Sequence, residues 1–328
     1  MRRREFVTLL GGAAATWPMA ARAQQPAMPV AGLLLSGSTA AFTTNVAAFR
    51  KGLSDTGYIE GENVTIEYHW LEGQYDRLQG IAADLVRRRV AVIVAPGSAP
   101  AALAAKAVTP TIPIVFAVGE DPVKLGLVTS LARPGGNATG VNFFVNELVA
   151  KRLELLHELI PRAARVAVLV NPAAVTNTEA TLRDVGVAAR TKGLEVLTLK
   201  AGSNREIDAA FAALARERAD ALFVAPDGFF FSRRVQFATL AARDRIPATY
   251  ASRPYVDVGG LMSYGTSVTD RYYQVGIYTS RILRGEKPAD IPVVQSTKFE
   301  FILNLQTASA LGLDVPAHFM LRADELIE

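Results

Sequence analysis

Short apolar runs alternate with amphipathic helical patterns along almost the whole chain, and this alternation constrains the fold more than any other feature. The continuous apolar runs indicate strands buried on both faces. Between them, apolar residues recur three and four positions apart, as at Phe42, Val46, Phe49 and Leu53. The alternation predicts parallel sheets with crossover helices. We expect strands at 30–35, 63–70, 90–95, 112–118 and 139–144, and then at 166–170, 194–199, 221–225, 247–250 and 260–264.

The pattern starts twice, which indicates an α/β fold with two sheets. A helical segment that carries Leu148, Leu155, Leu156 and Leu159 separates the two sets of strands. The chain is too long for one compact core, and no low-complexity linker divides it. We therefore expect two doubly wound parallel-sheet lobes, joined by a hinge and facing each other across a cleft. The expected lobes are 27–143 with 266–296, and 144–265 with 297–328.

Residues 1–23 have the features of an export signal of the twin-arginine type. Arg3 and Arg4 precede a short apolar core, and Ala21 and Ala23 place small residues where a signal peptidase accepts them. The apolar core is well short of the ~20 residues that span a bilayer, so we expect no membrane anchor. The sequence predicts a free, monomeric protein of the periplasm.

The composition excludes several classes of protein. The 328 residues include no cysteine, which excludes disulfides, a thiol nucleophile and a cysteine-linked lipid. The net charge of +4 falls to about +1 without the leader, in which four arginines outnumber one glutamate. No basic cluster with interleaved aromatic residues occurs, so we expect no nucleic-acid partner.

Catalytic arrangements are hard to build from this sequence. The three histidines, His69, His157 and His318, lie outside the loops expected at the cleft, which argues against a histidine base and a zinc site. The sequence holds no nucleophile elbow and no phosphate-binding glycine loop, so we do not expect an enzyme. The alternative is an exported hydrolase that uses carboxylates, with Glu120 and Asp121 as the candidate pair.

The candidate site residues follow the expected strands, because loops at the carboxyl ends of parallel strands line ligand-binding crevices. They offer hydroxyls, carboxylates and an arginine, which suit a zwitterion with one carboxylate and one ammonium. A serine at a helix start can instead be only a cap, and an aspartate after a strand only a turn residue. The candidates are Ser36, Ser38, Phe42, Gly97, Ser98, Glu120, Asp121, Asn171, Asp227, Arg253 and Tyr264. We expect at least two of the three phenylalanines 229–231 to belong to the core.

Motifs spread over nearly the whole chain are shared with a known family. They are Arg-Arg-Glu-Phe at 3–6, Asp-Pro-Val at 121–123, Pro-Gly-Gly-Asn-Ala-Thr-Gly-Val at 134–141, Lys-Arg-Leu-Glu-Leu-Leu at 151–156, Gly-Gly-Leu-Met-Ser-Tyr-Gly at 259–265 and Arg-Ala-Asp-Glu at 322–325. In combination they resemble the ABC-transporter substrate-binding proteins, a family that includes aromatic amino-acid binders. The resemblance implies a type I periplasmic binding fold with three crossovers between its lobes. It also implies delivery of a small solute to an inner-membrane ABC permease, without a cofactor and without catalysis.

Two loops depart from the family pattern. Ala173 and Ala174 stand where the family commonly has asparagines, and Gly228 follows Asp227 where proline is frequent. The resemblance leaves the solute open, and we expect an amino acid or a related carboxylate. A sugar-responsive repressor would share the fold but would begin with a DNA-binding helix pair, whose place the leader occupies.

Overall fold

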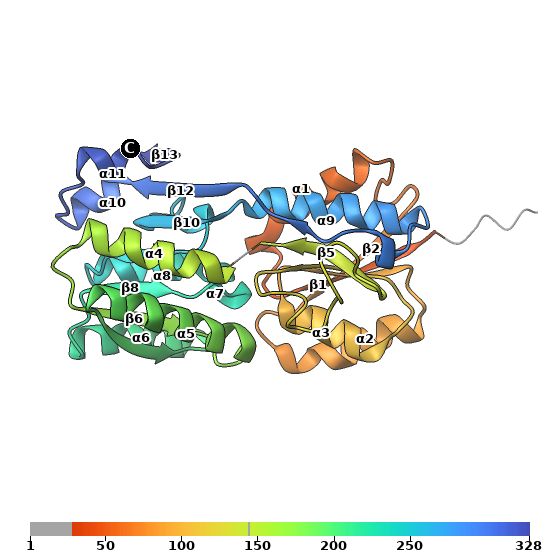
Figure 1. Cartoon of the computed structure of the whole chain (residues 1–328), viewed down its shortest axis with the longest axis horizontal. Helices are drawn as coiled ribbons and strands as arrows, with labels where there is room; N and C mark the ends of the chain where they lie inside the picture. The colour runs from red at the N-terminus through yellow and green to blue at the C-terminus, as the bar shows by residue number, and fades with distance from the viewer. Residues whose placement is uncertain (1–27, 144) are drawn as a thin grey trace, which may run out of the picture.

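The computed structural model describes residues 28–143 and 145–328, which form two α/β lobes lying side by side (Figure 1). The expected export signal at 1–23 lies outside the described residues. Within the described part, none of the helices combines the length and the apolar character needed to cross a bilayer. The prediction of two sheets with crossover helices is confirmed.

The first lobe is built on a six-stranded sheet in the order β11-β5-β4-β3-β1-β2, and all its strand pairs are parallel. Helices cover both of its faces, which explains why β3 and β4 are apolar and buried throughout. The strands are β1 (Val30–Leu35), β2 (Thr65–Trp70), β3 (Val92–Pro96), β4 (Ile114–Val118), β5 (Ala138–Asn142) and β11 (Val294–Gln295). The helices are η1 (Ala40–Phe42), α1 (Thr43–Ser54), η2 (Tyr75–Arg77), α2 (Leu78–Arg87), α3 (Ala99–Val108), α9 (Val268–Leu283) and η4 (Pro288–Asp290).

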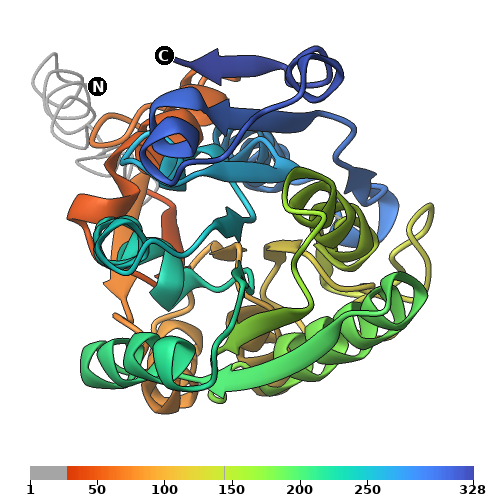
Figure 2. The ribbon, with the colours of Figure 1, turned by 90° about the vertical axis from the view of Figure 1, so that its left-hand side faces the viewer.

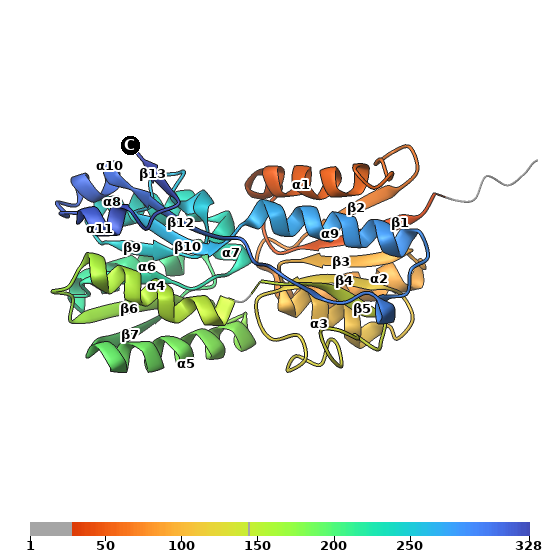
Figure 3. The same ribbon diagram turned by 45° about the horizontal axis from the view of Figure 1, so that its top comes forward.

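Helix α9 comes late in the chain, yet it packs against α1 at the start of the first lobe (Figure 3). Two glycines allow this close approach. A Cβ atom built on Gly52 would lie 2.1 Å from the carbonyl oxygen of Tyr273, and one on Gly276 would lie 2.3 Å from that of Phe49. Larger residues would therefore push the two helices apart.

The second lobe is built on a seven-stranded sheet in the order β13-β12-β10-β9-β8-β6-β7. Its strands run between two groups of helices (Figure 2). The strands are β6 (Arg165–Val170), β7 (Glu195–Lys200), β8 (Ala221–Val224), β9 (Ala248–Tyr250), β10 (Met262–Thr266), β12 (Phe299–Asn304) and β13 (Glu325–Ile327). The helices are α4 (Val145–Leu159), α5 (Val175–Lys192), α6 (Asn204–Arg216), α7 (Gly228–Ser232), α8 (Arg234–Arg243), η3 (Arg253–Tyr255), α10 (Leu305–Ala310) and α11 (Ala317–Met320).

One strand pair of this sheet departs from the expected parallel order. Strand β12 runs antiparallel to β10, with Tyr264 opposite Phe301. The reason is the path of the chain: it leaves the second lobe at the end of β10, adds α9 and β11 to the first lobe, and returns as β12 (Figure 1). The chain passes between the lobes three times, after β5, after β10 and after β11.

Candidate ligand-binding site

A cavity of about 120 Å³ lies between the two lobes and receives residues from both. Its walls come mainly from the loops that follow parallel strands, where helix N-termini leave backbone N–H groups unpaired. The first lobe contributes Ser36 after β1, Gly97 and Ser98 after β3, Glu120 after β4 and Phe143 after β5. The second lobe contributes Asp227 after β8, Ser252 after β9 and Thr266 at the end of β10.

Seven of the eleven predicted site residues line this cavity. They are Ser36, Phe42, Gly97, Ser98, Glu120, Asp227 and Tyr264. The structure does not place Ser38, Asp121, Asn171 or Arg253 in the lining. Each of these four residues has another place, which the local geometry explains.

The loop after β1 packs against Phe42, since a Cβ atom built on Gly37 would lie 2.1 Å from the Phe42 ring. Phe42 lines the cavity at this point, and Ser38 does not. Asp121 caps the turn that follows it, and its Oδ1 accepts hydrogen bonds from the N–H groups of Val123 at 2.9 Å and Lys124 at 3.3 Å. It therefore serves the turn and not the cavity.

Arg253 is held away from the cavity by two carboxylates. Its Nη2 donates to Glu325 Oε1 at 2.6 Å, and its Nε lies 3.2 Å from Asp257. Asn171 acts one step behind the lining, because its Nδ2 donates to Asp227 Oδ1 at 3.1 Å. Asn171 thus positions a lining residue.

Asp227 caps α7 and keeps hydrogen-bonding capacity for a ligand. Its Oδ1 accepts from the N–H of Phe230 at 3.0 Å, and its Oδ2 accepts from the Tyr75 hydroxyl at 3.3 Å. With the Asn171 amide these are three bonds, whereas an ionised carboxylate has about four acceptor positions. Burial raises the pKa of Asp227, although these donors oppose the shift. A ligand cation would compensate for the cost of burial.

Glu120 is a second carboxylate of the cavity and is only 8% exposed. Burial raises its pKa, and the N–H groups of Glu120 itself and of Gly119 counteract that shift. Among the described side chains, no lysine or arginine forms an ion pair with it. Glu120 and Asp227 therefore give the cavity two acidic groups, one on each lobe.

Glu120 should cost stability when the cavity is empty. Because its pKa is raised in the folded state, the protein is stabilised below the usual pKa of a glutamate and loses this stability as the pH rises through the raised value. Glu120→Gln should therefore raise the free energy of unfolding at pH 7 by about 0.5–2 kcal/mol. Thermal unfolding at pH 7 and pH 4 measures this, and the gain should shrink at pH 4. The exposed Glu62→Gln is the control; a lower melting temperature of Glu120→Gln at pH 7 would contradict the prediction.

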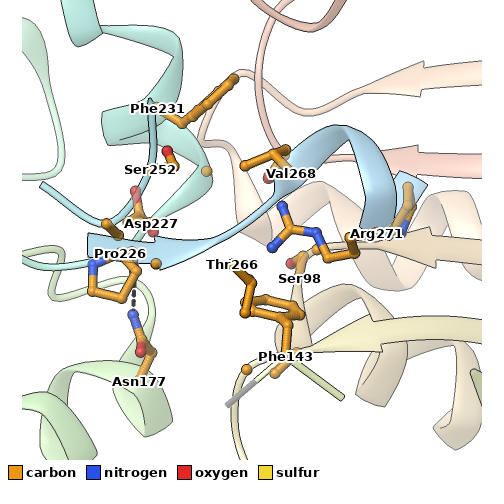
Figure 4. A pocket seen from close by; sticks show the side chains of 18 of the residues that line it. Ser98, Phe143, Asn177, Pro226, Asp227, Phe231, Ser252, Thr266, Val268 and Arg271 are labelled. Carbon is orange, nitrogen blue, oxygen red and sulfur yellow. Dashed lines mark hydrogen bonds between the residues drawn. The ribbon is translucent and has the colours of Figure 1, made fainter. Parts of the chain in front are cut away.

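Arg271, which is not among the predicted site residues, is the basic group that faces Asp227 across the cavity (Figure 4). Arg271 lies in the first turn of α9, directly after the second crossover. Its guanidinium lies over the Phe143 ring at 4.1 Å, and its Nε has no hydrogen-bond partner among the described side chains. Burial lowers its pKa. A guanidinium in this position can bind a carboxylate through two hydrogen bonds.

Arg152 carries a second buried guanidinium and also lines the cavity. It is not among the predicted site residues either. It extends from α4 over the Phe223 ring at 4.0 Å, and its Nη2 donates to the carbonyl of Val224 at 2.8 Å. Burial lowers its pKa to about 9. The Lys-Arg-Leu-Glu motif at 151–154 was noted only as a mark of the family.

Aromatic rings form the rest of the wall. Phe42 from the first lobe and Phe231 from the second approach each other with 5.0 Å between ring centroids. Phe143, Tyr264 and Tyr272 also line the cavity. Phe229 and Phe230 are buried in the core, as expected for at least two of the three neighbouring phenylalanines.

Two lobes connected by three crossovers, with a polar and aromatic cavity between them, define a periplasmic binding protein of the type I fold. The model of the family described as "ABC transporter substrate binding protein" matches residues 35–327, and the chain belongs to this family. It is thus a solute-binding protein of an ABC transporter that works outside the cytoplasm and binds its solute without transforming it. This decides against the exported hydrolase and confirms the family expected from the motifs.

Two relatives connect the family with aromatic amino acids. The chain is 30% identical over 265 residues to the tyrosine-binding protein of Clostridioides difficile (strain R20291), across 81% of this chain and 75% of that protein. It also resembles the structure of an ABC domain in complex with L-Trp from Streptococcus pneumoniae. The TM-score is 0.81 at 25% identity, and the match covers 91% of this chain and 99% of the other.

The chain superposes better on the L-Trp complex than on a related structure described as open. A ligand-free, open structure of a substrate-binding protein with adhesive properties from Clostridium difficile has a TM-score of only 0.63. That structure is 28% identical to this chain, and the match covers 92% of this chain and 99% of the other. In this chain the lobes are in contact beside the cavity, where the Tyr75 hydroxyl donates to Asp227 and the Phe42 ring packs on Phe231. We call this arrangement closed.

Proposed function

We propose that this protein binds an aromatic amino acid as a zwitterion. The observation that carries the proposal is that Asp227 and Arg271 face one cavity from opposite lobes (Figure 4). The solute's ammonium binds Asp227 with support from Glu120. Its carboxylate binds Arg271 and the N–H of Ala99, the first residue of α3, where Ser98 is the cap. The aromatic side chain packs against Phe42, Phe143 and the rings around them. Two acidic and two basic lining residues suit a ligand of zero net charge.

Binding of such a solute stabilises the closed arrangement, because it bridges groups on both lobes that are apart when the protein is open. We place the lobes at 27–143 with 266–296, and at 144–265 with 297–328. A permease in the inner membrane then distinguishes the closed, loaded protein from the open one. The protein acts as a monomer.

The test is to identify the solute and to remove its charges one at a time. Mass spectrometry of the denatured, natively purified protein should find an aromatic amino acid. Calorimetry should show binding of at least one of L-tyrosine, L-tryptophan and L-phenylalanine, with weak or no binding of L-leucine. Tyramine, which lacks the carboxylate, and 3-(4-hydroxyphenyl)propanoate, which lacks the ammonium, should bind much more weakly than L-tyrosine. A different co-purified solute, together with no binding of the three amino acids, would refute the proposal.

The route to the periplasm is the twin-arginine pathway in this proposal, and it rests on the Arg-Arg-Glu-Phe sequence at 3–6. Replacing Arg3 and Arg4 together by lysine should leave uncleaved precursor in the cytoplasm. Fractionation with N-terminal sequencing measures this, and the parent protein from the periplasm should begin at Gln24. Arg2→Lys, which keeps the pair intact, is the matched control. Unchanged secretion of the double variant would show that another pathway is used.

A further inference from the structure

The beginning of α7 in the second lobe contacts the first lobe beside the cavity. Asp227 accepts the hydrogen bond from Tyr75 of the first lobe, and Phe231 packs on Phe42. Gly73 of the first lobe lies against Phe229, since a Cβ atom built on Gly73 would be 3.0 Å from that ring. Gly228 lies in the middle of these contacts.

Gly228 has no space for a side chain in the closed arrangement. A Cβ atom on Gly228 would lie 1.8 Å from Ser36 Oγ, 2.6 Å from Ser36 Cβ and 3.8 Å from Ser36 Cα. Rotation of the Ser36 side chain would move its Oγ away but not its Cβ. An alanine at position 228 and a serine at position 36 are therefore incompatible at this distance between the lobes.

The backbone of the second lobe gives no reason for glycine at position 228. Its φ angle lies outside the left-handed region, and it is the first residue of α7, where alanine is well tolerated. The Cβ contacts all come from Ser36, which belongs to the other lobe. The requirement for glycine therefore exists only when the lobes are closed.

Ser36 is held firmly on its side of the contact. It follows β1 and is 5% exposed, and its carbonyl accepts a hydrogen bond from the N–H of Gly73 at 3.0 Å. The preceding carbonyl, that of Leu35, accepts from the N–H of Leu71 at 2.8 Å. These bonds attach the Ser36 backbone to the loop after β2, so it cannot retreat without disturbing that loop.

We propose that Gly228 and Ser36 form the steric stop that sets how closely the two lobes approach around the solute. A side chain at position 228 holds α7 away from the first lobe and moves Asp227, its neighbour in the chain, away from the solute. Residue 228 thus determines affinity without a contact of its own side chain with the solute. The stop is independent of the solute's identity, and only the choice of L-tyrosine as a probe below rests on the proposed function.

The first experiment is a double-mutant cycle with calorimetry, using L-tyrosine as the probe. Gly228→Ala should weaken binding by about tenfold to a hundredfold, the effect of a displacement of about 1 Å in a binding site, and should leave the melting temperature of the solute-free protein the same or higher. In the Ser36→Gly background, where Cα at 3.8 Å becomes the nearest atom, the same substitution should change affinity by less than about threefold. Gly80→Ala on α2, where nothing lies within 4 Å, is the control and should bind as the parent does.

The second experiment needs no solute and so separates this inference from the proposed function. Because the chain has no cysteine, Gly73→Cys with Phe229→Cys introduces a unique pair. Gly73 has a φ angle of 85°, so its substitution strains the loop, and this strain is common to all the proteins that are compared. The Cβ atom built on Gly73 lies 3.4 Å from Phe229 Cβ when the lobes are closed, close to the Cβ separation in disulfides. Under mild oxidation this pair should cross-link more slowly when Gly228→Ala is added to the double-cysteine protein. Adding Ser36→Gly as well should restore the rate of the double-cysteine protein that keeps Gly228 and Ser36.

The outcomes are distinct. Loss of L-tyrosine binding in the parent would count against the proposed function, while the cross-linking rates would still decide on the stop. Equal cross-linking rates with and without Gly228→Ala would overturn the stop. An equal loss of affinity from Gly228→Ala in both Ser36 backgrounds would overturn it as well.

Discussion

Asp227→Asn should weaken the binding of L-tyrosine by about 2–5 kcal/mol, because it leaves the buried ammonium of the solute without its charged partner. Asparagine has the same shape and also caps helices, so α7 should stay folded. Calorimetry measures the affinity, and circular dichroism checks the fold. Asp121→Asn is the control. It alters the carboxylate that follows Glu120 in the chain and lies outside the cavity lining, so it should bind as the parent does. Parent-like affinity of Asp227→Asn would leave Glu120 as the partner of the ammonium.

The same pairing predicts a dependence on pH. Burial raises the pKa of Asp227 in the solute-free protein, and only its ionised form attracts the ammonium. Affinity should therefore be complete above this raised pKa and should fall as the pH drops through it. In Asp227→Asn the fall should be smaller, since only Glu120 then titrates in the acidic part of the site.

Arg271→Gln should cause a loss of similar size, about 2–5 kcal/mol, because the carboxylate of the solute loses its guanidinium. Arg271→Lys should restore little of it, since an ammonium provides neither the planar pair of donors nor the same stacking on Phe143. Arg281→Gln on the same helix, where the arginine is already paired with Glu286, is the matched control.

Tyramine shows whether the loss concerns the carboxylate. It lacks that group, so Arg271→Gln should change its binding far less than that of L-tyrosine. If Arg271→Gln binds L-tyrosine like the parent and Arg152→Gln does not, Arg152 holds the carboxylate and the proposed orientation of the solute is wrong.

The fold could be predicted because buried parallel strands and their helices leave local patterns in the sequence. All ten expected strands exist, and each begins and ends within two residues of its predicted bounds. Strands β11, β12 and β13 were missed. They follow the second crossover, and their positions depend on contacts with strands far away in the chain.

The site could be predicted best where it lies in loops after strands. Asp227, Ser98 and Glu120 have such places and line the cavity. Arg271 and Arg152 lie on helices, and nothing local distinguishes them from arginines that face solvent. What brings them to the cavity is the path of the chain between the lobes. Arg253 was predicted from its position in a loop after a strand but does not line the cavity. Its partners Glu325 and Asp257 could not be inferred from that position.

The packing of α9 on α1 has a consequence for how the chain is made. The first lobe is not continuous in sequence: α1 ends at Ser54, and its partner helix starts at Val268. At 5–20 residues per second, a ribosome makes α9 roughly 10–40 s after α1. During this time the apolar face of α1, with Val46, Phe49 and Leu53, lacks the helix that covers it. The lobe whose strands are made first is therefore completed only when most of the second lobe has been synthesised, and a chain interrupted before residue 268 exposes this face.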